Sequence, residues 1–372
     1  MIKKVAVVTS IAPNKLNSDG RPSGLIWEII NEYKNHNVDV DTVVIPQTAN
    51  KFMRVLHRYG IYFSRISNLE KYDRIIVYPE YLSMAISSKY SSKMIVLGPD
   101  SPSLRDSRIY KFMHRGLFRY VKLLYKYASY VHEYHVASHA SRFVVVGRVD
   151  QLWMKRNPLI KNNKKLIDRV KFLHHPLLNN VIKKDTKIEI SNIDKVFVFA
   201  GDLSYLHNYE FIECVINELQ KRCIGVSISP EFKFVVIGKQ NKWISIQLNK
   251  VPGCKVHQID WIEDYSDVCV PGKHVHCLPI LVGSGTKNRT LTALASGLEV
   301  ITTPVGIENI PWRGLSECFI TRNPSRFVDY IMRLNQRGFD NEKWNVIKLE
   351  REQFRNKVTT LFKDDFVKYF LE

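Results

Sequence analysis

The stretch "HVHCLPILVGSGTKNRTLTALASG", residues 274–297, places an apolar run, a glycine loop and a short helical pattern in direct succession. The apolar run has the composition of a buried strand. Leu291, Leu294 and Ala295 follow the i, i+3, i+4 spacing of one helix face, and Gly297 can end that helix. The stretch therefore predicts one strand, loop and helix of an α/β domain.

The loop "GSGTKNR", which begins at Gly283, has the composition of an anion-binding site. Gly283 and Gly285 allow a ligand to approach the backbone, and the start of a helix directs N–H groups and a positive dipole end at an anion. We expect Thr286 at the N-cap. Lys287 and Arg289 then fall in the first helical turn, where the dipole favours acids, so two cations there indicate a bound anion. A solvated turn without a ligand is the alternative.

Short β-branched runs alternate with helix-length segments along both halves of the chain. In order, the runs are "KKVAVVTS", "VDVDTVVIP", "YDRIIVYPE", "KMIVLGPD", "RFVVVGRVD", "KVFVFAGD", "FKFVVIGK", "CKVHQIDW", "HVHCLPI", "LEVITTPV" and "CFIT". This alternation predicts an α/β fold with two Rossmann-like, doubly wound domains. We place the N-terminal domain at 1–178, the C-terminal domain at 179–340 and a helical tail at 341–372, with packing back on the N-terminal domain as one arrangement for the tail.

Positive charge is concentrated in the first half of the chain. Residues 1–178 carry 29 Lys and Arg against 13 Asp and Glu, a net charge of +16, whereas residues 179–372 carry 26 against 23, a net charge of +3. A positive half attracts nucleic acid, an anionic membrane surface or an acidic substrate. No run of about 18 uncharged apolar residues is present to span a bilayer, so we expect a cytoplasmic protein.

Two common phosphate-binding motifs do not fit the glycine loop. A dinucleotide fingerprint would need glycine at Asn288, and it would follow the first strand of its domain rather than a late one. The sequence also contains no GxxxxGK[ST] motif. The loop therefore belongs to another class of anion-binding fold.

The stretch resembles the donor-binding segment of GT-B glycosyltransferases of the glycosyltransferase family 4 kind. In a subgroup of that family a strand ending in proline leads into "GxGT(K/R)xK", an "LEAMA.G" helix and a "PVV.T..G.E" strand and turn. Residues 278–310 read "LPILVGSGTKNRTLTALASGLEVITTPVGIENI". The resemblance implies two Rossmann-like domains facing a central cleft.

Further segments resemble the same family in the same order. Residues 196–219, "VFVFAGDLSYLHNYEFIECVINEL", resemble the start of the donor domain with its "G.(L/M)SY..N" pattern. Residues 131–153, "VHEYHVASHASRFVVVGRVDQLW", are similar to the segment that closes the acceptor domain, with Glu133 and Asp150 at matching places. The first domain matches only in pattern, with a strand, a glycine loop and a helix.

The resemblance implies a retaining, metal-independent enzyme that transfers sugar from a nucleotide-sugar donor to a glycan or lipid-linked acceptor, in surface polysaccharide or glycoconjugate synthesis. No cofactor and no metal are expected. The residues implied in catalysis are Lys287, Arg289 and Glu308. Those implied in donor binding are Gly201, Ser204, Tyr205, Gly283, Ser284, Gly285, Thr286 and Thr292. Those expected on the acceptor side or in the cleft are Gly20, Gly24, Asp100, Glu133 and His174.

One position departs from the family pattern. Family members usually carry a glutamate on the donor helix that binds the donor ribose, and Thr292 stands there. A hydroxyl can hydrogen-bond a ribose, but without the charge of a carboxylate. We expect activity with an altered donor preference, and a catalytically inactive, donor-binding relative is the alternative.

Residues 107–131 have the pattern of one cationic amphipathic helix. Its apolar stripe consists of Ile109, Met113, Leu117, Tyr120, Leu124 and Tyr127. Its cationic stripe consists of Lys111, Arg115, Arg119, Lys122 and Lys126. Such a helix can lie on an anionic membrane surface, which would make the protein peripherally membrane-associated. An ordinary surface helix with a solvated basic face is the alternative.

A second class of function is a nucleic-acid-binding protein, including an enzyme that glycosylates DNA. The net charge of +16 and the aromatic-rich basic helix favour it. Against it, the sequence contains no recognised nucleic-acid-binding module. We therefore favour the glycosyltransferase.

Overall fold

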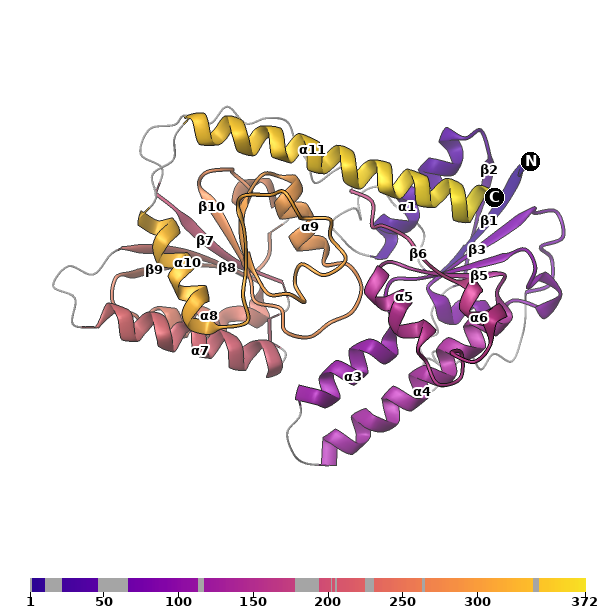
Figure 1. Cartoon of the computed structure of the whole chain (residues 1–372), viewed down its shortest axis with the longest axis horizontal. Coiled ribbons are helices and arrows are strands. Elements are labelled where there is room, and N and C mark those ends of the chain that lie inside the picture. Colours follow the sequence, from indigo (N-terminus) through magenta and orange to yellow (C-terminus); the bar gives the residue numbers. More distant parts are fainter. Residues whose placement is uncertain are drawn as a thin grey trace. The chain divides into compact units, whose positions relative to one another are not determined.

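The structure, a computed structural model, describes residues 2–10, 22–45, 66–112, 117–177, 194–201, 203–204, 206–224, 231–262, 265–336 and 341–372. The chain groups into two compact units. Unit 1 comprises Met1–Asn179, Ser284–Thr286 and Val358–Glu372, and unit 2 comprises Asn180–Gly283 and Lys287–Lys357. Each unit is an α/β domain with helices packed on a parallel sheet (Figure 1).

Unit 1 is built on a six-stranded parallel sheet with the order β2-β1-β3-β4-β5-β6. Its strands are β1 (Lys4–Thr9), β2 (Asp39–Val44), β3 (Arg74–Tyr78), β4 (Met94–Gly98), β5 (Arg142–Val145) and β6 (Val170–Phe172). Its helices are α1 (Pro22–Asn35), α3 (Pro102–Phe112), α4 (Leu117–His139), α5 (Arg148–Lys155) and α6 (Lys164–Arg169), with the last part of α11 (Asn341–Phe366).

Both faces of this sheet are covered. Ala6 and Val8 of β1 join the core that contains Phe143, whereas Val5 and Val7 join the core on the opposite face. Successive side chains of a strand point to opposite faces, so a strand buried on both sides must be apolar throughout. This is why the strands are continuous β-branched runs in the sequence.

Unit 2 has a second six-stranded parallel sheet, with the order β12-β11-β10-β7-β8-β9. Its strands are β7 (Val196–Ala200), β8 (Phe232–Ile237), β9 (Cys254–Ile259), β10 (His274–Leu278), β11 (Glu299–Thr302) and β12 (Cys318–Ile320). Its helices are α7 (Leu206–Cys223), α8 (Lys242–Leu248), α9 (Asn288–Ala295) and α10 (Pro324–Gln336), with the first part of α11.

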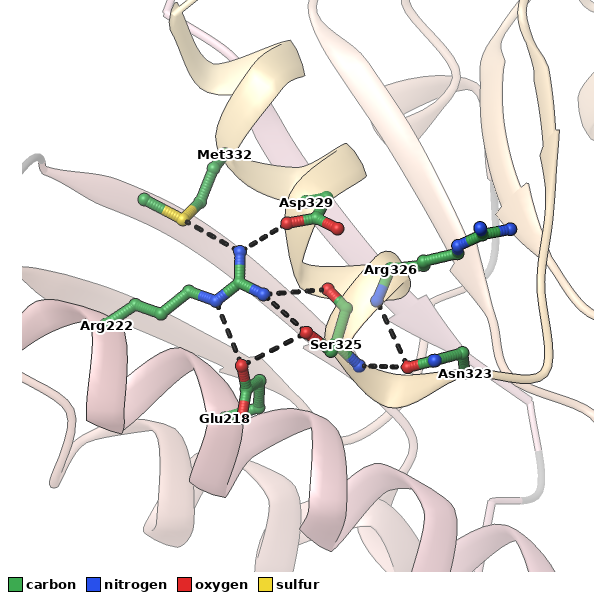
Figure 2. A network of polar contacts seen from close by, with 7 residues as sticks. All are labelled: Glu218, Arg222, Asn323, Ser325, Arg326, Asp329 and Met332. Atoms are coloured by element: carbon green, nitrogen blue, oxygen red, sulfur yellow. Dashed lines mark hydrogen bonds and ion pairs between the residues drawn. The ribbon is translucent and has the colours of Figure 1, made fainter.

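Helices α7 and α10 are joined by a polar network around Arg222 (Figure 2). The Arg222 guanidinium donates to Glu218 Oε1 at 3.0 Å and to Ser325 Oγ at 2.6 Å, and it also pairs with Asp329. Phe211 of α7 packs edge-on against Phe327 of α10 beside this network. The two helices thus form one layer on the sheet of unit 2.

The predicted α/β fold with two doubly wound domains is confirmed, and each run predicted as a strand contains one. The short strand β6 was not predicted. Residues 107–131 do not form one helix, because α3 ends at Phe112 and α4 begins at Leu117. These helices pack side by side in Figure 1. The predicted boundary between residues 178 and 179 lies outside the described residues.

Candidate functional site

The carboxyl ends of β7 and β10 form the topological switch point of unit 2. These strands are neighbours, and the chain proceeds from β7 to β8 and β9 on one side and from β10 to β11 and β12 on the other. Open α/β sheets bind ligands where the strand order reverses in this way. Gly201 directly follows β7, and Gly283 lies in the loop after β10.

Two cations pack over these two glycines. A Cβ atom on Gly201 would lie 3.3 Å from Arg289 Nε, and a Cβ atom on Gly283 would lie 2.9 Å from Lys287 Cε. Gly201 also has a φ of +110°, which L side chains rarely adopt. The structure thus brings together four residues that the sequence predicted for one site.

The loop after β7 is held by a residue that the sequence analysis missed. Asn241, which is fully buried, donates through Nδ2 to the carbonyl oxygens of Gly201 (2.5 Å) and Ile237 (2.6 Å). Its Oδ1 accepts the N–H of Leu203 at 3.1 Å. An asparagine near the start of a helix is usually interpreted as a local capping residue, so the sequence does not indicate that Asn241 binds Gly201, about 40 residues away.

Helix α9 begins one residue later than predicted, with Lys287 rather than Thr286 at the N-cap. The Thr286 hydroxyl and N–H both donate to the carbonyl oxygen of Val146, at 3.0 and 3.1 Å. The N–H of Gly285 donates to Asp150 Oδ1 at 2.9 Å. These two amides therefore serve protein acceptors, contrary to the expectation that they face an anion.

Residues 284–286 belong to unit 1, where they meet the end of β4. The Ser284 hydroxyl donates to Asp100 Oδ2 at 2.6 Å. Gly285 has a φ of +67°, and a Cβ atom there would lie 2.8 Å from the carbonyl oxygen of Pro99. Any other residue at position 285 would collide with the backbone, so this close approach requires glycine.

Glu133 is fully buried beside residues 101–103, which follow β4. Its carboxylate accepts hydrogen bonds from the Ser101 hydroxyl (2.8 Å), the Ser103 hydroxyl (2.8 Å) and Asn157 Nδ2 (3.1 Å). Burial raises the pKa of Glu133 from 4.5 to about 7, although these hydrogen bonds favour the charged form. Glu133 thus holds Ser101 and Ser103 in place and does not reach the surface of unit 1.

Two other predicted acceptor-side residues, Gly24 and His174, lie in α1 and just after β6. Gly24 is buried within α1. The ring Nδ1 of His174 lies 2.7 Å from Asp365 Oδ2, which also accepts the His174 N–H at 2.8 Å. Gly20 lies outside the described residues, as do Tyr205 of the predicted donor site and Arg115 of the predicted cationic stripe.

The remaining predicted donor-side residues lie on α9 and at the carboxyl edge of unit 2. Ser204 is exposed after β7, and Thr292 is half-buried on α9. Glu308 is half-buried in the turn after β11, which pairs with β10. These three polar side chains, which the sequence predicted for the donor site, therefore lie on segments that flank the switch point.

Two buried histidines lie on β10 below this edge. Burial lowers the pKa of His274 to about 3 and the pKa of His276 to about 4, and the charge of Arg289 contributes to the second shift. Nε2 of His276 lies 2.8 Å from the carbonyl oxygen of Val268. Both rings are neutral at physiological pH and fill structural positions in the sheet.

The α4 helix of unit 1 exposes apolar and basic side chains together. Tyr120, Leu124 and Tyr127 are 67%, 69% and 55% exposed, so these three residues of the predicted apolar stripe face solvent. Lys126 lies over the rings of Tyr127 and Tyr130, with Nζ 5.9 and 5.6 Å from the ring centroids. A helix that only packed on the sheet would bury this stripe.

Neither a metal-binding cluster nor a membrane-spanning helix occurs in the described part of the chain. No group of three or more His, Cys, Asp or Glu side chains is placed to hold a metal ion there. Within the same residues, none of the helices combines the length and hydropathy needed to cross a bilayer.

Part of the chain matches a family of known proteins, and the whole chain is similar in fold to solved structures. Residues 194–337 match the family described as "Glycosyl transferases group 1". A search of curated protein sequences found no match. Solved structures with the same fold include Anabaena HepE in complex with UDP and glucose, which is 11% identical with a TM-score of 0.57 and 99% of each chain covered.

Two further structures agree in fold. Sucrose-phosphate synthase from Thermosynechococcus elongatus is 10% identical, with a TM-score of 0.59 and coverage of 97% of this chain and 95% of that chain. WaaG, a glycosyltransferase involved in lipopolysaccharide biosynthesis, is 10% identical, with a TM-score of 0.56 and coverage of 98% and 99%. Residues 194–337 thus match the group 1 glycosyl transferases, and the chain as a whole has the two-domain GT-B fold of these solved structures.

Proposed function

We propose that this enzyme transfers a glycosyl group from a nucleotide sugar to a glycan or lipid-linked acceptor, with retention and without a metal ion. The observation that carries the proposal is the packing of Arg289 over Gly201 and of Lys287 over Gly283 at the switch point of unit 2. This edge lies within the segment that matches the glycosyltransferase family. The complex of Anabaena HepE with UDP and glucose supports a nucleotide-sugar donor.

The two cations suit the charge that develops during transfer. Cleavage of the glycosyl bond leaves negative charge on the departing nucleoside diphosphate, and preorganised cations stabilise that charge. Lys287 at the N-cap of α9 and Arg289 in its first turn provide these cations. Glu308 binds hydroxyl groups of the sugar. Thr292 takes the place of the ribose-binding glutamate of related enzymes and contributes a neutral hydrogen bond.

The donor nucleotide can be identified by ligand-induced stabilisation. UDP, GDP, CMP and dTDP and their sugar conjugates are each added to the protein, and thermal unfolding is followed. A ligand present at about 100 times its dissociation constant stabilises the fold by about 2.7 kcal/mol. A flat response to all of them would argue against a nucleotide-sugar donor.

Single alanine variants of Lys287 and Arg289 test the roles of the two cations. We expect each to lower turnover by about 10²-fold, because one preorganised charge-stabilising group is lost, and to weaken nucleoside diphosphate binding. Lys255→Ala is the matched control, since Lys255 pairs with Glu231 at the opposite end of β9. Wild-type turnover and affinity in both cation variants would show that this loop is an ordinary strand-to-helix turn.

We also propose that α4 holds the enzyme on an anionic membrane. There it would act from the cytoplasmic side in the synthesis of surface glycoconjugates. The exposed stripe Tyr120, Leu124 and Tyr127 and the adjacent Lys122 and Lys126 support it, because apolar side chains enter the interface while cations meet the headgroups. The role of WaaG in lipopolysaccharide biosynthesis supports a related pathway.

Sedimentation with vesicles tests this docking. Vesicles of phosphatidylcholine with about one third phosphatidylglycerol should bind the wild type, and glutamate at Arg119, Lys122 and Lys126 of α4 should weaken binding by about 100-fold or more, at about 1 kcal/mol per lost cation. The control reverses Lys161, Lys164 and Lys165, which are exposed at α6. Equal losses in both triple variants would mean that net charge alone, and not α4, attracts the protein.

A further inference from the structure

Asp150 joins two parts of unit 1 that are far apart in the sequence. It lies in the first turn of α5 and is fully buried. Its Oδ1 atom accepts the backbone N–H of Ser101 at 2.9 Å and the backbone N–H of Gly285 at 2.9 Å. A buried carboxylate needs such donors because it has lost its hydration, and the resulting charge-assisted hydrogen bonds are among the stronger ones in proteins.

Ser101 is itself fixed from the other side. The fully buried Ser101 hydroxyl donates to Glu133 Oε1 at 2.8 Å and accepts the N–H of Leu104 at 3.2 Å. Glu133 also accepts the N–H and the hydroxyl of Ser103. The loop that donates to Asp150 is therefore anchored by a second buried carboxylate, Glu133.

The segment Ser284–Thr286 is held in unit 1 at every residue. Ser284 donates to Asp100, Gly285 donates to Asp150, and Thr286 donates twice to Val146. Of these acceptors, Asp150 is the one that is both charged and fully buried. Lys287, the first of the two cations, is the next residue in the chain.

We propose that Asp150 is a positioning residue for glycosyl transfer, which holds the backbone of Ser284–Thr286 and so fixes the chain from which α9 and its cations Lys287 and Arg289 start. The inference rests on the proposed function. Asp150 touches no substrate in this role and acts through the Gly285 amide. A displacement of about 1 Å at the reacting groups lowers a rate by about 10²-fold, so such support has a measurable effect.

The variants Asp150→Ala and Asp150→Asn separate positioning from simple stabilisation. Alanine removes the acceptor, whereas the side-chain oxygen of asparagine can still accept hydrogen bonds but without charge. The matched controls are Asp106→Ala and Asp106→Asn. Asp106 is also a buried aspartate of unit 1. Its Oδ2 accepts a hydrogen bond from the Ser129 hydroxyl at 2.9 Å, so this bond holds α4 and not residues 284–286.

Three quantities are measured on the full chain. The first is amide hydrogen exchange of the peptide spanning 284–289, and the second is the affinity for the nucleoside diphosphate selected by the thermal-shift panel. The third is kcat, followed as the release of that nucleoside diphosphate from the nucleotide sugar. We expect Asp150→Ala to speed exchange in this peptide and to lower kcat by about 10²-fold. Asp150→Asn should recover part of both, and both Asp106 variants should leave kcat and this exchange as in the wild type.

Each result decides the inference. Unchanged exchange at 284–289 in Asp150→Ala overturns it, and so does faster exchange with wild-type kcat and nucleotide affinity. An equal fall of kcat in Asp106→Ala would also overturn it, since any loss of a buried aspartate would then suffice. If the wild type transfers no sugar, the proposed function fails separately, and exchange and nucleotide affinity still decide whether Asp150 positions the segment.

Discussion

The loops that follow the strands hold differently charged side chains in the two units. In unit 1 the edge presents Asp100 and Asp150, with Glu133 beneath it, whereas in unit 2 it presents Lys287 and Arg289 beside two glycines. The first 178 residues nevertheless have a net charge of +16, which is far more positive than the rest of the chain. The net charge of a domain therefore describes its outer surface and says little about the charge at its functional edge.

The two edges also differ in how their charges are stabilised. Asp150 and Glu133 of unit 1 are fully buried and accept hydrogen bonds from serine and backbone donors, whose positions are fixed by the fold. Arg289 in unit 2 is exposed, so water solvates it and a ligand can reach it. Buried charge of the first kind suits support of a loop, and accessible charge of the second kind suits binding of an anion.

The largest expected effect concerns the buried carboxylate of unit 1. The pKa of Glu133 rises from 4.5 to about 7 on burial, so between these values the folded protein binds a proton that the unfolded chain has released. The free energy of unfolding that this bound proton contributes is fully present below pH 4.5 and is lost as the pH rises through about 7. By linkage it amounts to about 3 kcal/mol. Urea unfolding of the wild type and of Glu133→Gln at several pH values measures it.

The difference between wild type and Glu133→Gln should carry this pH dependence, because glutamine does not titrate. The buried His175 and His276, whose pKa values burial lowers to about 4, act in the opposite sense, since their contribution is lost as the pH falls from 6.5 towards 4. They are common to both proteins and cancel in the comparison. A constant difference from pH 4.5 to 7 would mean that Glu133 is ionised throughout.

A smaller effect is expected at the cationic edge. Gly201→Ala places a side chain at a φ of +110° and within 3.3 Å of Arg289 Nε. The backbone strain should cost about 1–2 kcal/mol of stability, and displacement of Arg289 should weaken nucleoside diphosphate binding. Calorimetric titration and thermal unfolding measure the two separately.

Gly314→Ala is the matched control for this variant. Gly314 also lies in unit 2, has a φ of +100° and would have no atom within 4 Å of a new Cβ. It should lose similar stability and keep its nucleotide affinity. If the two variants bind nucleotide equally well, Arg289 does not need its place over Gly201.

The alternation of apolar, β-branched runs with helix-length segments predicted most of the fold, because strands buried on both faces are apolar throughout. Local rules failed where distant partners decide the structure. Thr286 fits an N-cap by its neighbours, but the carbonyl of Val146 engages its hydroxyl and its amide, and α9 begins at Asn288. Asn241 and the buried state of Glu133 likewise depend on contacts that no sequence window contains.

The smallest expected effect concerns Thr292, the half-buried threonine of α9. If its hydroxyl binds the donor ribose in place of a glutamate, Thr292→Ala should weaken nucleotide affinity by about 1 kcal/mol, the worth of a neutral hydrogen bond. Titration calorimetry with the selected nucleoside diphosphate can resolve this difference. The loss should be smaller than that of Arg289→Ala, because no charge is removed.

Thr290→Ala is the control on the same helix. Thr290 is fully buried, and its hydroxyl has no hydrogen-bond partner among the described residues, so its removal should leave nucleotide affinity unchanged. A loss at Thr290 equal to that at Thr292 would trace the effect to packing of α9 rather than to a ribose contact. Wild-type affinity in Thr292→Ala would remove Thr292 from the donor site and leave nucleotide recognition at this edge to the cations.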